Sequence, residues 1–124
     1  MGSGVFTKGV KKELIGYVQE LNLEFGTTLV RSLTNINPLD TGLSRSNWHI
    51  TFTPDSNNIL PVSSNIGTVG NAAVMLQGKD LTKDFNIVNN VPYIVPLLNG
   101  HSKQAKRGWM DRSISHNLDK VYGV

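Results

Sequence analysis

The stretch KDFNIVNNVPYIVPLLNGHSKQAKRGWMDR, residues 83–112, decides how the rest of the chain is organised. It opens with an alternating run over residues 85–89 whose length and composition are typical of a β-strand. An apolar turn follows Pro92, and a basic loop over residues 100–108 precedes Trp109, which starts an amphipathic helix. This order of strand, corner, basic loop and anchoring tryptophan predicts a loop presented to a partner rather than an enclosed catalytic pocket.

The size and composition of the chain predict a single domain, residues 1–124, with a hydrophobic core. A length of 124 residues with 39% hydrophobic content lies within the range of single-core domains. No apolar run approaches the ~20 residues that a membrane helix needs, and the first residues lack the basic and apolar regions of a signal peptide. We therefore expect no membrane partner and no secretion. The absence of cysteine excludes disulfides and thiolate zinc sites.

The excess positive charge lies near the C-terminus. Although the net charge is only +3, residues 99–124 carry five basic and two acidic side chains. A patch of this size attracts polyanions weakly and in a salt-sensitive way, so we favour a solvated basic loop over a nucleic-acid contact. The basic residues are Lys103, Lys106, Arg107, Arg112 and Lys120, and the acidic ones are Asp111 and Asp119.

Residues 6–36 have the clearest helical periodicity. Their apolar side chains recur at steps of three and four, which forms one stripe of a long helix. Gly26 favours a bend, and Pro38 ends the helix because the residue before a proline is pushed out of helical geometry. A helix of this length is too long for so small a globule to cover, so we expect it to meet a sheet or a neighbouring subunit. The stripe consists of Phe6, Val10, Leu14, Val18, Leu21, Phe25, Leu29, Leu33 and Ile36.

A strand is predicted over residues 48–53, where apolar and polar residues alternate. The alternation places His49 on the side opposite the apolar residues, and we expect it to face solvent. Between the long helix and this strand, Asp40 is placed to cap a short helical turn that reaches Arg45. The apolar residues of the strand are Trp48, Ile50 and Phe52.

Residues 55–71 predict an extended arm or irregular hairpin, because Ser, Asn and Gly separate isolated apolar residues. Asn71 is expected to cap a short helix over residues 72–77, which Gly78 closes. A final amphipathic helix begins at Trp109.

No pattern typical of catalysis or of a metal site is present. The three histidines, His49, His101 and His116, are far apart in sequence and lack the spacing of a helical metal pair. A serine nucleophile needs a base and an oxyanion site, and no G-x-S-x-G elbow surrounds Ser102. We therefore expect no enzymatic activity, cofactor or metal, and a hydrolase using His101 and Ser102 is the least favoured alternative.

Two sequence boxes carry a family resemblance. The first is NPLDTGLSRSNW, residues 37–48, and the second is VNNVPYIVPLLNGHSKQA, residues 88–105. The first resembles the P-x-D-T-G-x-L-x-x-S-W box of small neck and tail-completion proteins of long-tailed bacteriophages. The second resembles their other box, in which a strand ending in Asn-Asn leads through Pro-Tyr and an apolar turn to a Gly-x-Ser loop. The motif residues are Asp40, Thr41, Gly42, Trp48, Asn90, Pro92, Tyr93, Gly100 and Trp109.

The resemblance implies an α+β fold in which a long N-terminal helix packs on a small, mostly antiparallel twisted sheet, with short flanking helices and a C-terminal helix. It also implies a structural virion protein, assembled in the host cytoplasm, that forms a homo-oligomeric ring, commonly sixfold. Such a ring joins or completes the head–tail interface. Its partners would be connector or adaptor proteins and tail-terminator or tail-tube proteins, and genomic DNA would pass through the channel non-specifically.

A ring repeats a weak basic cluster around its axis, which multiplies the charge. We therefore expect His101, Ser102, Lys103, Lys106 and Arg107 to line the channel or to contact a partner. A tail-terminator ring that caps the tail tube stays open as an alternative. A small basic nucleic-acid-binding domain is a further alternative, from a different class.

Overall fold

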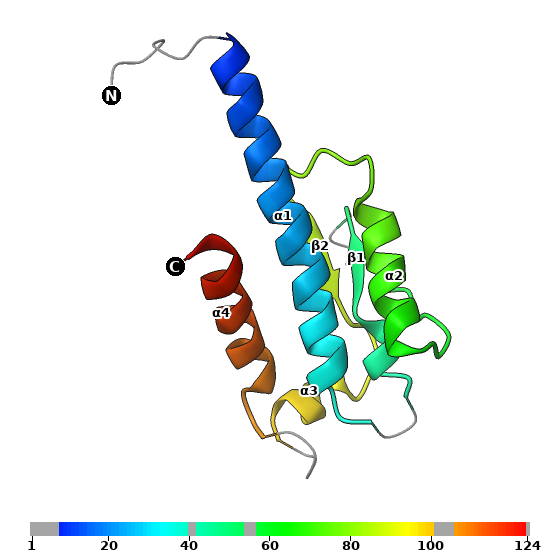
Figure 1. Ribbon diagram of the computed structural model, residues 1–124. Coiled ribbons are helices and arrows are strands. Elements are labelled where there is room, and N and C mark those ends of the chain that lie inside the picture. Colours follow the sequence, from blue (N-terminus) through cyan, green and yellow to red (C-terminus); the bar gives the residue numbers. More distant parts are fainter. Residues whose placement is uncertain (1–7, 40–41, 54–56, 101–105, 124) are drawn as a thin grey trace.

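The computed structural model describes residues 8–39, 42–53, 57–100 and 106–123. A single long helix runs through the molecule, with a two-stranded sheet and one helix on one side of it and the C-terminal helix on the other (Figure 1). The predicted α+β fold, with its long N-terminal helix, small antiparallel sheet and C-terminal helix, is confirmed. In chain order the elements are α1 (Lys8–Ile36), the 3-10 helix η1 (Arg45–Asn47), β1 (His49–Thr51), α2 (Asn65–Leu76), β2 (Asn86–Val88), α3 (Ile94–Leu98) and α4 (Trp109–Tyr122).

Helix α1 is the axis of the fold and matches the stretch predicted from its apolar stripe. It continues through Gly26 without a break. The glycine there serves close packing, because a Cβ atom at this position would lie 2.8 Å from Cδ1 of Leu76 on α2. The helix ends where Asn37 donates its backbone N–H to the carbonyl of Leu33, directly before Pro38.

The sheet consists of β1 and β2, paired antiparallel with Ile50 opposite Ile87. All three residues of β1 are buried, so the strand is covered on both faces. The prediction that His49 faces solvent is therefore wrong: its side chain is only 7% exposed. Phe52, which lies beyond the end of β1, is 36% exposed and packs against the ring of Phe85.

Helix α2 corrects the prediction of an extended arm over residues 55–71. Among the described residues, 57–64 are irregular, but the helix already begins at Asn65. Its N-cap is Ser64, whose side chain accepts a hydrogen bond from the backbone N–H of Gly67, and not Asn71 as the sequence predicted. The sequence of this segment does not indicate a helix, because its glycines and β-branched residues are poor helix formers. Packing of the buried face of α2 against α1 and β1 outweighs that propensity.

One hydrophobic core joins these elements, and both tryptophans belong to it. The indole of Trp109 at the start of α4 is 2% exposed, which confirms its predicted role as an anchor. The rings of Trp48 and Trp109 meet edge to face, with centroids 6.1 Å apart. The buried members of the core are Leu29, Val30, Leu33, Trp48, Ile50, Ala72, Leu76, Leu81, Ile94 and Trp109.

Candidate functional site

The first box, residues 37–48, is organised around the fully buried side chain of Asn37. Its Oδ1 accepts a hydrogen bond from Nε1 of Trp48 at 2.9 Å, and its Nδ2 donates to Oγ of Ser44 at 2.8 Å and to the carbonyl of Pro38 at 3.0 Å. The backbone carbonyl of Asn37 accepts two further hydrogen bonds from the guanidinium of Arg45, at 3.0 and 2.8 Å. The asparagine thus fixes the end of α1 against the entry to β1.

The same box holds the irregular segment that leads to α2. Asn47 donates to the carbonyl of Leu60 at 3.0 Å and accepts the backbone N–H of the same residue at 2.6 Å. Ser46 similarly accepts the N–H of Ser63 at 2.9 Å. Side chains of the box therefore replace the strand partner that this segment lacks, and they satisfy its backbone groups.

Of the motif residues in the first box, Gly42 and Trp48 can be placed. Gly42 has φ of +84°, a left-handed conformation that favours glycine, and Trp48 is buried in the core. The predicted helical turn between Asp40 and Arg45 lies partly outside the described residues; Ser44 has right-handed helical backbone angles, and the 3-10 helix η1 begins at Arg45. Asp40 and Thr41 lie outside the described residues.

The two boxes are in contact in the folded chain, although about 40 residues separate them in sequence. Asn89 donates from Nδ2 to the backbone carbonyl of Ser44 at 2.8 Å. Trp109, which packs against Trp48, donates from Nε1 to the carbonyl of Leu97 at 3.0 Å. The residues that carry the family resemblance therefore form one continuous unit rather than two separate motifs.

The motif residues of the second box have different structural roles. Asn90 donates to the carbonyl of Asn58 at 3.0 Å, which ties the end of β2 to the irregular segment. Pro92 is exposed and Tyr93 is half-buried. Gly100 has φ of +85°, and a Cβ atom there would lie 3.1 Å from the backbone N of Arg107, so this turn excludes larger residues.

His49 is a buried polar group that the sequence placed in solvent. Its Nδ1 lies 2.8 Å from the carbonyl of Asn47, which can only accept, so Nδ1 carries the proton. Nε2 is buried and has no hydrogen-bond partner among the described residues. An unpaired ring nitrogen of this kind is costly when buried.

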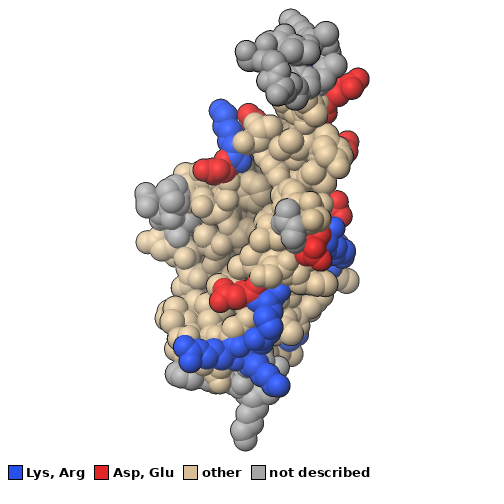
Figure 2. Space-filling view, turned by 90° about the vertical axis from the view of Figure 1, so that its left-hand side faces the viewer, with Lys and Arg blue, Asp and Glu red and all other residues tan. Residues whose placement is uncertain are grey.

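Basic side chains gather at the end of the molecule where α4 begins (Figure 2). The guanidinium of Arg112 donates to the carbonyls of Arg107 and Lys106, at 2.8 and 3.4 Å, so this helix holds the end of the basic loop. Lys106 and Arg107 are exposed, as a contact role requires. The other three predicted contact residues, His101, Ser102 and Lys103, lie outside the described residues.

At the opposite end, the N-terminal part of α1 extends beyond the other elements (Figure 1). Four large apolar side chains on this part of the helix are exposed: Leu14 is 47%, Ile15 53%, Tyr17 61% and Val18 42% exposed. We call these four residues the α1 apolar patch. The body of the protein covers the helix from about Gln19 onward, where loop and C-terminal residues contact it.

The described residues contain no group of three His, Asp or Glu side chains placed to hold a metal ion. Within the same ranges, no helix is long and apolar enough to cross a membrane. A wider search with the complete chain finds no matching family model, no similar curated protein and no similar solved structure.

The sequence reasoning missed the residues that hold the first box together. Asn37, Ser44, Ser46 and Asn47 are not among the motif residues predicted from the sequence, yet each is buried and hydrogen-bonded. The sequence carries one signal for them. Small polar residues precede Trp48, which lies directly before a strand, and a buried indole N–H needs a hydrogen-bond acceptor nearby.

Proposed function

We propose that this chain is a structural protein of a bacteriophage neck, which forms a ring that joins or completes the head–tail interface around the DNA channel. The observation that carries the proposal is the α1 apolar patch, which a single copy leaves uncovered. A heterologous contact, in which this patch meets a different surface of the next copy, closes into a ring when the rotation permits. Six copies are expected from the resemblance of the two boxes.

The size of the α1 apolar patch suggests how firmly copies associate. Full burial of a large apolar side chain is worth about 1.5–3 kcal/mol, so covering the exposed halves of four such side chains contributes roughly 3–6 kcal/mol. A micromolar Kd needs about 8 kcal/mol. The patch therefore does not hold a ring by itself, and we expect assembly to need further contacts from the neighbouring copy or from a connector or tail protein.

The contact between the two boxes adds support. In a family defined by these boxes, the residues should form one structural unit, and Asn89 with Ser44 and Trp109 with Trp48 join them here. The basic cluster lies at the other end of the molecule from the α1 apolar patch (Figure 2). Under this proposal, subunit association and the contact with DNA or a tail partner use separate surfaces.

A nucleic-acid-binding domain is the second candidate, because Lys106, Arg107 and Arg112 lie together. Its affinity should fall steeply with salt concentration. A tail-terminator ring belongs to the same structural class as the leading proposal and would share the α1 apolar patch as its association surface.

The experiment is complementation of a phage that lacks this gene, with variants of the patch. Leu14→Glu together with Val18→Glu should give unjoined heads and tails, while the purified variant keeps the far-ultraviolet circular dichroism of the wild type because both side chains are already exposed. Leu23→Glu is the matched control, since Leu23 is also exposed but points to the opposite side of α1. Absence of the polypeptide from purified virions would refute the proposal.

A separate exchange tests the basic loop. Replacing Lys103, Lys106 and Arg107 by serine should weaken the joining of heads to tails without unfolding the protein. Normal joining by this variant would exclude the loop as the partner or channel contact and would leave the ring proposal standing.

A further inference from the structure

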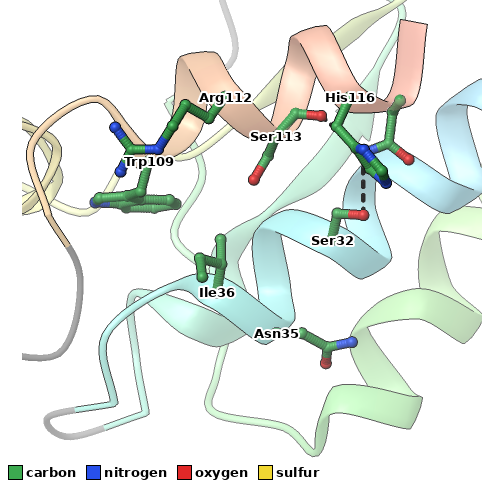
Figure 3. Close-up of a pocket in the computed structure, with 8 residues that line it drawn as sticks. Ser32, Asn35, Ile36, Trp109, Arg112, Ser113 and His116 are labelled. Carbon is green, nitrogen blue, oxygen red and sulfur yellow. Dashed lines mark hydrogen bonds between the residues drawn. The ribbon is translucent and has the colours of Figure 1, made fainter. Parts of the chain in front are cut away.

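A groove of about 450 Å³ lies between the last turns of α1 and the helix α4. Figure 3 shows Ser32, Asn35 and Ile36 of α1 on one side, and Arg112, Ser113 and His116 of α4 on the other. We call it the α1–α4 groove. Its lining contains no residue of the α1 apolar patch. The indole of Trp109 contributes to its floor.

The groove is rich in hydrogen-bond donors that have no acceptor. The hydroxyl of Ser113 and the ring of His116 make no hydrogen bond to any residue in the described ranges. Oγ of Ser32 accepts from Nδ2 of Asn117 at 3.0 Å, so its own proton stays available. Arg112 uses one N–H of each terminal nitrogen on backbone carbonyls, which orients the guanidinium and leaves its remaining N–H groups free.

The formal charge in the lining of the groove is positive. No carboxylate lines it, and Arg112 is permanently positive. Asp111 lines a different cavity, on the side of α4 that faces Leu98 and Arg107. Donors without acceptors beside an uncompensated cation are complementary to a group that supplies several acceptor oxygens and a negative charge, which is the chemistry of a carboxylate or a phosphate.

The shape favours a carboxylate on a peptide. Ile36 is 44% exposed at the edge of the groove and offers an apolar surface beside the donors. A duplex presents one phosphate per ~3.4 Å on each strand, along a convex surface, and is matched by a row of cations. The groove is recessed between two helices, and Arg112 is the one permanently charged side chain in its lining.

We propose that the α1–α4 groove binds an acidic segment of another protein, with one Glu or Asp side chain on Arg112, a neighbouring one on Ser113, His116 and Ser32, and an adjacent apolar side chain against Ile36. Arg112, whose guanidinium lies over Trp109 (Figure 3), forms the charge-assisted pair with the first carboxylate, and the hydroxyls and the imidazole form hydrogen bonds with the second. This inference does not depend on the ring or on the virion, because one copy of the chain supplies the whole groove.

The test is titration of the ¹⁵N-labelled full chain with the blocked peptide acetyl-Leu-Glu-Leu-Glu-amide, followed by amide chemical shifts. Saturable shifts are expected at Ser32, Arg112, Ser113 and His116, and the matched peptide with Gln in place of Glu should bind at least tenfold more weakly. Arg112→Gln should weaken binding by about 10- to 100-fold, since a hydrogen bond to a charged group is worth about 1.5–3 kcal/mol. Lys120→Gln, which removes an exposed charge elsewhere on α4, should have no effect.

Ser113→Ala provides a second variant that does not disturb the backbone contacts of Arg112, and it should weaken binding several-fold. Three results would overturn the inference: no saturable shifts in the groove at millimolar peptide, equal binding of the Glu and Gln peptides, or duplex DNA that shifts the same amides more strongly than the peptide does. Failure of this test leaves the ring proposal untouched, because that proposal is tested by exchanges in the α1 apolar patch.

Discussion

Replacing Asn37 by alanine should be among the most destabilising single changes in this chain. The side chain of Asn37 is fully buried and is the only acceptor for Nε1 of Trp48 among the described residues. Alanine leaves that indole N–H without a partner in the core and removes the donor to Oγ of Ser44. It also leaves a cavity of the size of an amide group.

The magnitude follows from these losses. A buried donor left unsatisfied costs about 1–3 kcal/mol, and the lost hydrogen bond to Ser44 adds about 1 kcal/mol. With the cavity, we expect Asn37→Ala to lower the free energy of unfolding by roughly 3–5 kcal/mol, a large part of the 5–15 kcal/mol typical of a domain. Trp48→Phe should also destabilise, because it leaves Oδ1 of Asn37 without its donor.

The double variant separates this hydrogen bond from the cavities. Once both partners are gone, neither leaves the other unsatisfied, so the two effects should fall short of additivity by about 1–2 kcal/mol. Urea unfolding followed by far-ultraviolet circular dichroism gives the free energy of unfolding of the wild type, the two single variants and the double variant. An equal m value in all four proteins is the check on two-state behaviour. Additivity within about 0.5 kcal/mol would refute the view that Asn37 and Trp48 act as a unit.

Two further predictions concern the long helix and its C-terminal neighbour. Gly16→Ala should stabilise the protein by about 0.5–1 kcal/mol, because a Cβ atom there meets nothing within 4 Å and alanine is the better helix former. Gly26→Ala should instead destabilise it by about 1 kcal/mol, because crowding against Leu76 outweighs the same gain in helix propensity. If the two variants change the free energy of unfolding in urea in the same direction, this reasoning is contradicted. Burial raises the pKa of Tyr122 above its ordinary value of 10.0, so its neutral form favours the folded state. That contribution is complete below pH 10 and is lost as the pH rises through the raised pKa of the folded protein. The free energy of unfolding should therefore fall less steeply above pH 10 in Tyr122→Phe than in the wild type or in the exposed control Tyr17→Phe. Parallel curves of the free energy of unfolding against pH for the three proteins would disprove this prediction.

Periodicity predicted the elements that bury one face. The stripe over residues 6–36 gives α1 because its apolar residues are spaced by helical turns, and Trp109 starts α4 because a large aromatic residue followed by apolar residues at such spacing anchors a helix. These features are local, so the sequence alone carries them.

The features that failed depend on contacts between distant residues. His49 alternates with core residues and was placed in solvent, yet both faces of β1 are covered. Helix α2 contains Gly67, Gly70 and β-branched residues that disfavour a helix, but Thr68, Ala72 and Leu76 recur at steps of four and are buried. The donor groups of the α1–α4 groove come from two helices about 80 residues apart, and neither helix alone suggests them.

The ring planes of Trp48 and Trp109 lie at 88° to each other with centroids 6.1 Å apart, and this arrangement should be visible in the circular dichroism spectrum. Two indoles this close couple their electronic transitions, and their contact links the first box to the helix that follows the second. An exciton couplet in the circular dichroism spectrum should therefore disappear when the boxes separate, even while the helices remain intact. Following that couplet during association with a partner would reveal, without any added label, whether the subunit changes its internal packing as it assembles.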